Sequence, residues 1–309
     1  MDTTDWRVSG PDAGTRLDKF LAGADRLASR SRAADALRKG KVFLNEAEMG
    51  LHDAARPLVE GDAVRLWMDR PGSAARRGPH RAGVLDIVYE DAAIIAVNKP
   101  AGLLSVPLKR REEAPSVFSL LGESSSGRGF RRPLIVHRID RDTSGLVLFA
   151  RTHAAQLDLK EQFLRRQPER VYWAMVHGHV RQTRAEWRDL LAWDRTELRQ
   201  EEAEEDDLRA TEAISDVQVL EHLRDASLVE VRLVTGKRNQ IRIQAALRGH
   251  PLVGERQYLG PRPPSPAIAF DRQALHARRL NLTHPISGEF LHLECPLPPD
   301  MAQLLARLR

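Results

Sequence analysis

Residues 70–83 divide the chain into two parts, and this break constrains the fold more than any other feature. The segment reads RPGSAARRGPHRAG, is rich in proline, glycine and arginine, and has no apolar periodicity, which is typical of a linker. Residues 1–69 precede it and residues 84–309 follow it. A chain of 309 residues is long enough for about two domains, each with a hydrophobic core.

Composition excludes several classes of protein. With 42% hydrophobic and 29% charged residues, the chain is neither disordered nor fibrous. Its single cysteine, Cys295, excludes an internal disulfide and thiolate zinc clusters. No apolar run has the length of a signal peptide or a membrane span. We therefore expect a soluble cytoplasmic protein with no membrane partner.

The charge is unevenly distributed. The net charge is +5, yet residues 197–212 contain eight acidic residues and two arginines, so the rest of the chain is more basic than the total suggests. This pattern is compatible with a polyanionic partner that the acidic segment would avoid. A solvated surface without a partner explains the charge equally well.

The first unit reads as two short helices followed by strands. Thr15 is placed to cap a helix that carries Leu17, Phe20 and Leu21, and Ser29 or Ser31 to cap a second helix that ends at Gly40. Residues 41–45 and 63–68 read as strands. Several basic residues lie on or beside the second helix at spacings that place some on one face, which is compatible with phosphate binding: Arg30, Arg32, Arg38, Lys39 and Lys41.

The segments RLDKFLA (16–22), SRSRAADALRKGKVFLN (29–45) and VEGD (59–62) resemble the S-four-type RNA-binding domain. This resemblance implies a small α+β RNA-binding domain over residues 1–69. It implies RNA contacts for Arg32, Arg38, Lys39 and Lys41. Glu46 departs from the family, which usually has glycine after the asparagine, and we expect this to affect the turn rather than the fold.

The second unit is rich in strands. Residues 84–89 and 94–97 suggest a hairpin, and further strands are expected at 134–136, 146–150, 171–176 and 228–234. Helices are expected from Thr152 to about Arg166 and over residues 240–247. Strands that follow strands, with few helices, predict an α+β domain around a mostly antiparallel mixed sheet.

Three polar features could carry chemistry. The loop His137–Gly145 places two carboxylates among basic side chains, and Lys237–Arg242 forms a basic helix start that could attract an anion. Tyr172 lies in a predicted strand. Taken singly, the loop and the tyrosine are better explained by a hydrogen-bonded turn and a packed aromatic residue, and the helix start by a basic helix that faces solvent.

Taken together, the features resemble pseudouridine synthases of the RluA type. HRIDRDTSGLVLFA (137–150) is similar to the family's signature loop, and RVYWAMVHG (170–178) to its tyrosine strand. YEDAAIIAVNKPAGLLSVP (89–107), LVTGKRNQIRIQAALRGHPLVGE (233–255) and LHARRLNLTHPISGE (275–289) match other segments in the same order. The resemblance implies a pseudouridine synthase catalytic domain at 84–309, with flanking helices and a central cleft.

The resemblance also implies an activity and its residues. The chain would be an isomerase (an intramolecular transferase) that converts uridine to pseudouridine in RNA, with no cofactor and no metal. Asp140, Tyr172 and Arg242 would be catalytic, with Arg242 paired to Asp140 through two hydrogen bonds. Arg138 would fill the space left by the flipped base, and Arg141, Lys237 and Arg238 would contact RNA. Whether Asp140 attacks the ring, attacks the ribose or removes a ribose proton stays open.

Some residues depart from the family. Lys237-Arg238-Asn239 replaces the usual Arg-Thr-His, and Glu255 stands where aspartate is usual. We expect activity to persist with altered RNA contacts. The acidic stretch 197–212 is expected to be a surface insertion that lies away from the RNA or acts as a gate against wrong RNA.

Alternatives remain for the function and the partner. Ribosomal RNA is favoured as the substrate because an additional RNA-binding domain suits a structured RNA, and transfer RNA is the second choice. A non-catalytic RNA-binding or ribosome-assembly protein with the same fold is the main rival. A glycosidic-bond hydrolase would need a second, well-placed carboxylate. We expect a monomer.

Overall fold

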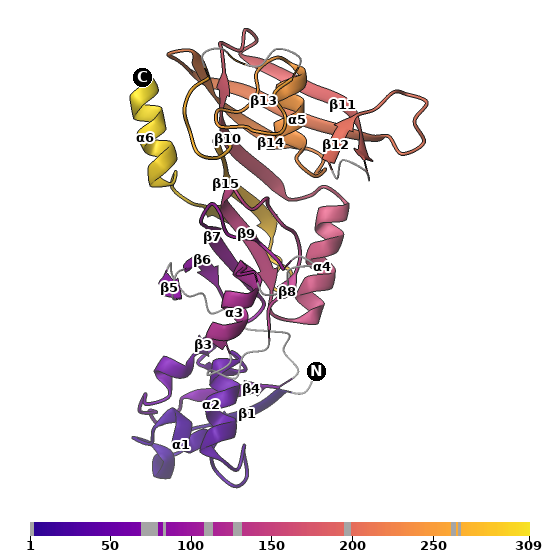
Figure 1. Cartoon of the computed structure of the whole chain (residues 1–309). Helices are drawn as coiled ribbons and strands as arrows, with labels where there is room; N and C mark the ends of the chain where they lie inside the picture. The colour runs from indigo at the N-terminus through magenta and orange to yellow at the C-terminus, as the bar shows by residue number, and fades with distance from the viewer. Residues whose placement is uncertain are drawn as a thin grey trace.

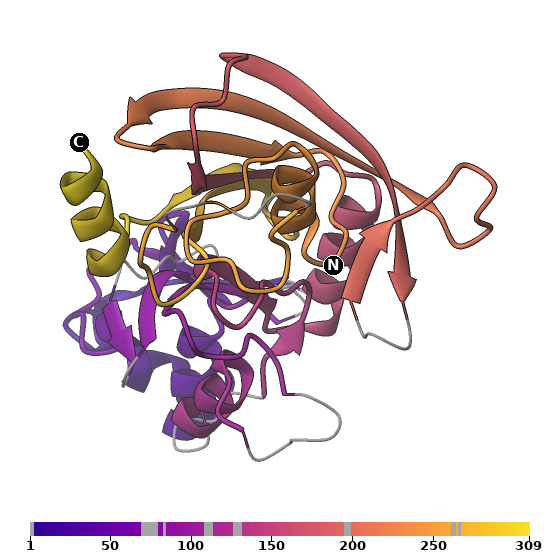
Figure 2. The same cartoon turned by 45° about the horizontal axis from the view of Figure 1, so that its top comes forward.

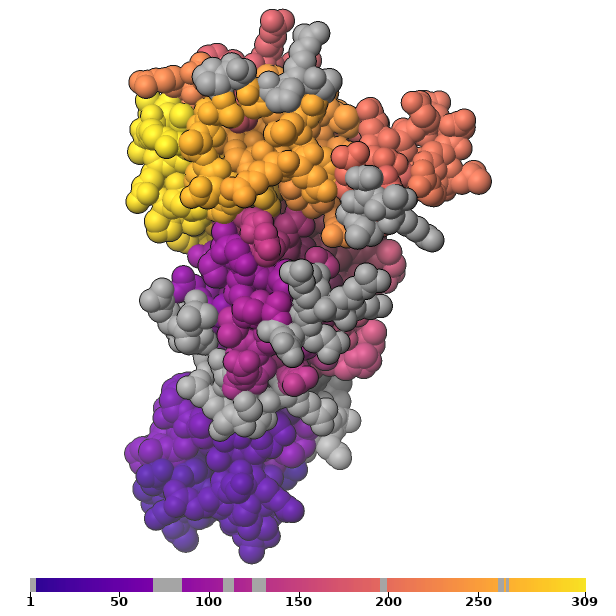
Figure 3. Space-filling view, viewed as in Figure 1, coloured from indigo at the N-terminus to yellow at the C-terminus, as the bar shows by residue number. Residues whose placement is uncertain are grey.

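The elements of the chain form two separate sheets. The computed structural model describes residues 3–68, 80–82, 85–107, 114–125, 132–194, 199–260, 264 and 267–309. The first sheet has four antiparallel strands in the order β1-β4-β2-β3: β1 (Thr3–Arg7), β2 (Val42–Leu44), β3 (Ala47–Met49) and β4 (Ala63–Trp67). Figure 3 shows this unit as the indigo lobe at one end of the molecule.

Two α-helices cover the first sheet, α1 (Leu17–Leu21) and α2 (Arg30–Arg38), along with the 3₁₀ turns η1 (Gly10–Asp12) and η2 (Leu51–Asp53). Ser29 caps α2, as predicted, because its hydroxyl accepts a hydrogen bond from the backbone N–H of Arg32 at 3.2 Å. The prediction for α1 was wrong in one detail, since Arg16 rather than Thr15 is the N-cap residue.

The turn between β2 and β3 shows what the glycine replacement does. Asn45 and Glu46 have φ angles of 49° and 66°, which are the left-handed values of a two-residue hairpin turn that normally favours Asn-Gly. Glu46 also forms an ion pair with Arg65 at 2.8 Å. The strands still pair on either side, so the departure strains the turn and leaves the fold intact.

The second sheet is large and mostly antiparallel, as predicted. Its order is β12-β11-β13-β14-β10-β15-β9-β7-β6-β5, with β16 beside β15 and β8 beside β9. The strands in chain order are β5 (His80–Ala82), β6 (Leu85–Glu90), β7 (Ile94–Lys99), β8 (Leu134–Ile135), β9 (Ser144–Ala150), β10 (Glu169–His177), β11 (Arg184–Asp194), β12 (Arg199–Glu202), β13 (Thr211–Leu223), β14 (Ala226–Leu233), β15 (Leu275–Thr283) and β16 (Phe290–Glu294).

Among the described residues, four helices flank this sheet: α3 (Val117–Ser125), α4 (His153–Leu164), α5 (Gln240–Leu247) and α6 (Pro299–Leu308) (Figure 1). The predicted bounds of α5 are confirmed. Thr152 caps α4 as predicted, accepting a hydrogen bond from the backbone N–H of Ala155 at 3.2 Å.

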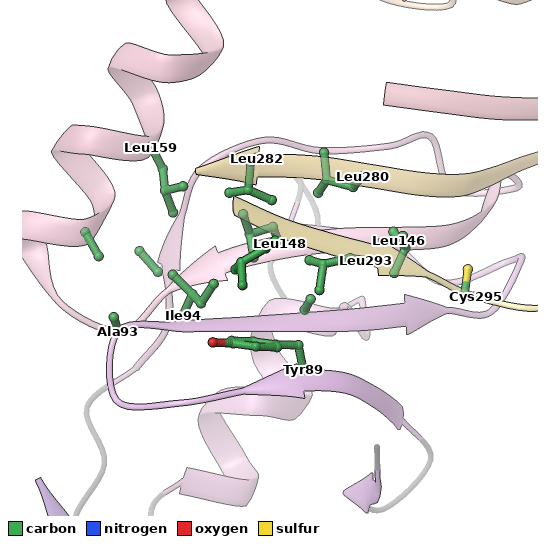
Figure 4. Packing of buried hydrophobic residues seen from close by; sticks show 14 residues of the cluster. Tyr89, Ala93, Ile94, Leu146, Leu148, Leu159, Leu280, Leu282, Leu293 and Cys295 are labelled. Atoms are coloured by element: carbon green, nitrogen blue, oxygen red, sulfur yellow. The ribbon is translucent and has the colours of Figure 1, made fainter. Parts of the chain in front are cut away.

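Strand β9 lies at the centre of one half of the sheet and is buried along its whole length. Because side chains alternate along a strand, Leu146 and Leu148 join one cluster with α4, while Val147 and Phe149 join another with α3. Figure 4 shows the first cluster. Burying one such leucine stabilises the fold by about 1.5–3 kcal/mol.

The other half of the sheet has the same layered arrangement. Tyr172 and Ala174 of β10 pack with Ile241 of α5, whereas Met175 packs with Met301 of α6 on the opposite face. Figure 2 shows strands β11, β13 and β14 arching over α5. The sheet is therefore covered differently on its two faces, and α5 lies on the same face as Tyr172.

The two halves join where β9 runs parallel to β15, the one parallel pairing among the described strands. Gly145 has a φ of 108°, and a Cβ atom there would lie 2.3 Å from the carbonyl oxygen of Ala277. Glycine is therefore required for the close approach of these two strands. The polar loop before Gly145 is thereby held at the centre of the sheet.

The predicted linker, residues 70–83, lies mostly outside the described residues, so its assignment as a linker stays a prediction. Its C-terminal limit was wrong, because His80–Ala82 form β5, which pairs with β6. An edge strand this short is stabilised by backbone pairing and leaves no apolar pattern to recognise.

Candidate active site

A cleft of about 710 Å³ opens on the α5 face of the second sheet. It is lined by the loop 136–143, the end of α4, strand β10 and residues 233–242. Among the described residues that line it, Asp140 is the one carboxylate, and the cationic side chains are Arg138, Lys160, Arg166, Arg170, Lys237, Arg238 and Arg242. The cleft is therefore strongly electropositive around a single acid, which suits a polyanion.

The loop that carries Asp140 is anchored on both sides of this residue. On the N-terminal side, Nε2 of His137 accepts a hydrogen bond from the backbone N–H of Leu148 at 3.0 Å. The hydroxyl of Ser105 donates to the carbonyl oxygen of Ile139 at 2.7 Å and accepts from its N–H at 3.2 Å. These bonds tie the loop to β9 and to the segment after β7.

Lys99 anchors the C-terminal side of the loop. Its ammonium is fully buried and donates to the carbonyl oxygens of Pro100, Leu103 and Arg141 at 2.8–2.9 Å. Burial lowers the pKa of Lys99 to about 7. Lys99 therefore fixes the backbone of the loop directly after Asp140.

Arg242 of α5 lies beside Asp140, as predicted, with Nη1 3.8 Å from Oδ2. The predicted two-hydrogen-bond geometry was wrong for this pair. Nε and Nη2 of Arg242 donate instead to both carboxylate oxygens of Glu255 at 2.7 Å. Glu255 has a fully buried side chain and also accepts three backbone N–H groups of residues 256–258. Its carboxylate therefore orients Arg242 and leaves one edge of the guanidinium toward Asp140.

The surroundings of Asp140 act on its charge in opposite directions. Burial raises the pKa of Asp140, while the cationic groups of Arg242, Arg138, Arg238 and Lys99 oppose this effect, and the net direction is upward. The Asp140 side chain is 27% exposed, so it faces the open cleft. A carboxylate of raised pKa in a cleft is a typical site for covalent or acid–base chemistry.

Tyr172 extends from β10 into the same cleft and is 9% exposed. Burial raises the pKa of its phenol, so the ring stays neutral near pH 7. The structure therefore brings the three predicted catalytic residues, Asp140, Tyr172 and Arg242, to one cleft.

The RNA contacts predicted in the second unit divide into two groups. Arg138, Lys237 and Arg238 line the cleft, and the guanidinium of Arg238 lies 4.2 Å from the ring centre of Trp193 in β11. Arg141 does not line it, because its side chain turns outward and pairs with Asp142 at 3.1 Å. Only the backbone of Arg141 supports the site.

The four basic residues predicted in the first unit gather around one hollow. Arg32, Arg38, Lys39 and Lys41 line a depression of about 660 Å³ beside α2. Asp35 also lines it and pairs with Lys39 at 2.7 Å. The hollow is therefore basic but partly neutralised.

The contacts of several residues of the site were not predicted from the sequence. Lys99 and Glu255 lie in segments that were recognised, but their contacts connect residues far apart in the chain. Asn239 has a left-handed φ of 55°; its side chain accepts from Arg242 and donates to the Tyr258 hydroxyl, both at 3.1 Å. Arg170 could have been predicted as a residue of the site, because it is two residues before Tyr172 in the same strand and its side chain therefore lies on the same face.

The acidic stretch begins beside the site rather than far from it. The backbone N–H of Gln200 in β12 donates to the Tyr258 hydroxyl at 3.1 Å, which links this strand to the Asn239–Arg242 network. The segment then leads outward to Leu208, whose side chain is fully exposed. Its role as a gate stays a prediction.

In the described part of the chain, no three histidine, cysteine, aspartate or glutamate side chains converge as a metal site. The helices found there are too short or too polar to cross a bilayer.

The sequence is similar to those of enzymes that modify RNA. Residues 93–247 match the family model for RNA pseudouridylate synthases. YlyB of Bacillus subtilis, an uncharacterized RNA pseudouridine synthase, is 33% identical over 312 residues, covering 100% of this chain and 99% of that protein. Ribosomal large subunit pseudouridine synthase D of Escherichia coli O157:H7 is 35% identical over 313 residues, covering 98% and 93% of the two chains.

The fold is also found among solved structures. The structure of human RNA pseudouridylate synthase domain containing 4 matches with a TM-score of 0.60 and 22% identity, covering 72% of this chain and 92% of that one. This likeness confirms the predicted architecture of the second unit.

Proposed function

We propose that ribosomal RNA is the substrate of this chain, which belongs to the RluA family of RNA pseudouridine synthases and isomerises uridine to pseudouridine in RNA. The reaction breaks the bond between ribose C1′ and uracil N1 and forms a bond between C1′ and C5. The C5 hydrogen leaves as a proton and N1 gains one. Atoms and electrons therefore balance without an oxidant, a reductant or a group donor.

The single carboxylate in the cationic cleft is the observation that carries the assignment of the site. Asp140 is the group that forms the covalent adduct or removes the ribose proton, and Arg242 lies 3.8 Å away to favour its ionised form. Tyr172 offers an aromatic face to a uracil ring, and such stacking contributes about 1–3 kcal/mol. The target base must leave its stack to reach Asp140.

Exposed basic groups at the mouth of the cleft would hold the RNA. Arg138 is two residues before Asp140 in the chain and exposed, so its side chain can enter the space that the flipped base leaves. Lys237 and Arg238 also line the cleft and supply further positive charge. In the first unit, the hollow formed by Arg32, Arg38, Lys39 and Lys41 would bind a second RNA segment, as expected of an S-four-type domain.

Two observations favour ribosomal over transfer RNA. The E. coli relative is named a ribosomal large subunit enzyme and aligns with nearly the whole of this chain. The basic hollow in the first unit provides a second docking surface for a large structured RNA. We propose a cytoplasmic location because the proposed ribosomal RNA substrate is found there, and we propose a monomer because one chain supplies every residue assigned to the reaction.

The alternative functions have less support. A glycoside hydrolase uses two carboxylates at its scissile bond, whereas Asp140 is the one acid among the described residues of the cleft lining, and Asp142 pairs outward with Arg141. A non-catalytic RNA-binding protein would not need the buried Glu255–Arg242–Asp140 arrangement.

The test is pseudouridine mapping of ribosomal and transfer RNA from cells that lack the gene, complemented with the wild-type chain or with Asp140→Asn. The proposal expects one or more ribosomal uridines to lose modification and to regain it only with the wild-type chain. Loss confined to transfer RNA would refute the ribosomal substrate, and full modification without the gene would refute both RNA classes as targets of this chain.

A further inference from the structure

Arg170 is a partly buried cation that has no carboxylate partner among the described residues, and its guanidinium lies 5.8 Å from the ring centre of Phe163. Nη2 donates weakly to the carbonyl oxygens of Leu233 and Val234, both at 3.3 Å, and Nε is buried with no hydrogen-bond partner. The neighbouring acid, Glu169, faces away and accepts from Asn281 at 2.7 Å.

The other arginines with largely buried side chains are paired differently. Each pairs with a carboxylate, at side-chain exposures between 9% and 27%: Arg26, Arg151, Arg242, Arg248, Arg272 and Arg278. Burying a charge without a partner is costly. Burial accordingly lowers the pKa of the Arg170 guanidinium. The desolvation of the Arg170 charge is therefore not offset by an ion pair, as it is at these other arginines.

The position of Arg170 suggests what compensates this cost. Arg170 and Tyr172 are two residues apart on β10, so their side chains lie on one face roughly 7 Å apart, and both line the cleft. The chain also leaves room for the guanidinium, because a Cβ atom on Gly236 would lie 2.4 Å from Nη1. The missing partner must therefore be an anion that enters the cleft.

Two further cations at the same corner point to a phosphate of the RNA backbone. Lys160 of α4 and Arg166, just beyond its end, also line the cleft. Arg166 has a left-handed φ of 57° because it ends α4 in a Schellman turn, in which the N–H groups of Arg166 and Gln167 donate to the carbonyl oxygens of Phe163 and Gln162. This turn holds the basic side chain at the end of α4, where it lines the cleft.

We propose that Arg170 binds a phosphodiester of the RNA next to the target uridine, with Lys160 and Arg166 extending this contact along the strand. Guanidinium groups bind phosphate oxygens through charge-assisted hydrogen bonds, and Nη1 of Arg170, which forms no hydrogen bond with the described residues and is not among the buried unpaired atoms, can supply one. This inference rests on the proposed RNA substrate and names the part of the cleft that holds its backbone.

The test compares full-length Arg170→Met and Arg170→Lys with wild type in binding to a uridine-rich RNA hairpin over a series of salt concentrations. We expect Arg170→Met to weaken binding about tenfold or more and to make the slope of log affinity against log salt shallower by about 0.7–0.9. Arg170→Lys should restore the slope. Arg165→Met is the matched control, because Arg165 is exposed, pairs with Glu161 and lies outside the cleft lining.

Thermal unfolding without RNA separates binding from packing. Replacing an unpaired buried cation by methionine should keep or raise the melting temperature while weakening RNA binding. An unchanged slope and affinity in Arg170→Met, a lowered melting temperature, or an Arg170→Lys variant that behaves like Arg170→Met would each overturn the proposal. Binding is measured without turnover, so this result is separable from the mapping experiment, which alone tests the identity of the substrate RNA.

Discussion

The contact between Arg242 and Asp140 makes a prediction that separates catalysis from folding. Nη1 and Oδ2 are 3.8 Å apart, with side chains only 12% and 27% exposed. At an effective dielectric constant of about 20, unit charges at this separation attract by about 4 kcal/mol. If the transition state uses this attraction in full, Arg242→Gln should slow the reaction by roughly a thousandfold at neutral pH.

The Arg242→Gln substitution should also shift the pH dependence of the reaction rate, in a direction set by the pKa of Asp140. Burial already raises the pKa of Asp140, and Arg242 opposes this. Removing the guanidinium should raise the pKa of Asp140 further, so a smaller fraction is ionised at neutral pH. The acid limb of the pH–rate profile of Arg242→Gln should therefore move to higher pH, with partial recovery of the rate in alkali.

The same substitution also affects stability, because Glu255 then remains as a buried charge without its cation. Breaking a buried pair in this way costs about 3–5 kcal/mol. Adding Glu255→Gln removes that charge, and the glutamine oxygen can still accept the backbone N–H groups of residues 256–258. The double variant should recover stability but not activity.

The assay combines urea denaturation with single-turnover pseudouridine formation between pH 6 and pH 9 for wild type, Arg242→Gln and Arg242→Gln/Glu255→Gln. A double variant that regains both stability and wild-type turnover would show that Arg242 serves only to pair with Glu255. An acid limb that does not move would refute the electrostatic coupling to Asp140.

Three further predictions concern the stability of the fold. Gly145→Ala should lower the free energy of unfolding in urea by at least about 3 kcal/mol, because the new Cβ would meet the Ala277 carbonyl at 2.3 Å; wild-type stability would contradict the close approach. Glu46→Gly should raise the free energy of unfolding by about 1 kcal/mol, since glycine adopts the positive φ without strain; a loss would mean that the ion pair with Arg65 outweighs the strain. Lys99 has a pKa of about 7 in the fold against an ordinary 10.5, so the unfolded state binds more protons between these values and stability should rise with pH there, by up to about 1.4 kcal/mol per unit. Stability curves measured at several pH values should lose this contribution in Lys99→Met, and an unchanged slope would assign it to other groups.

Local sequence patterns were enough to predict the helices and strands that carry the motifs. Helix α5 and strand β9 were predicted from their apolar patterning, with Gly249 just after the end of α5 and Thr152 just after the end of β9. The position of Asp140 was predicted from the loop that resembles the family. Helix α6 could also have been recognised, because Met301, Leu304, Leu305 and Leu308 follow helical spacing after Pro299.

Other features depend on contacts between distant parts of the chain. The parallel pairing of β9 with β15 joins residues 144–145 to 276–277, and nothing in either segment alone predicts it. The bidentate bond of Arg242 to Glu255 likewise depends on how the segment after α5 folds back. The lack of a carboxylate partner for Arg170 can be recognised only when the partners of the other buried arginines are known.

The most direct test of the account is release of tritium from RNA labelled at C5 of uridine, because that hydrogen is lost only when C5 forms the new glycosidic bond. The wild-type chain should release the label from ribosomal RNA, whereas Asp140→Asn, which preserves the size of the side chain, should bind the same RNA and release none. Release by Asp140→Asn at the wild-type rate would contradict the assignment of Asp140 as the catalytic group.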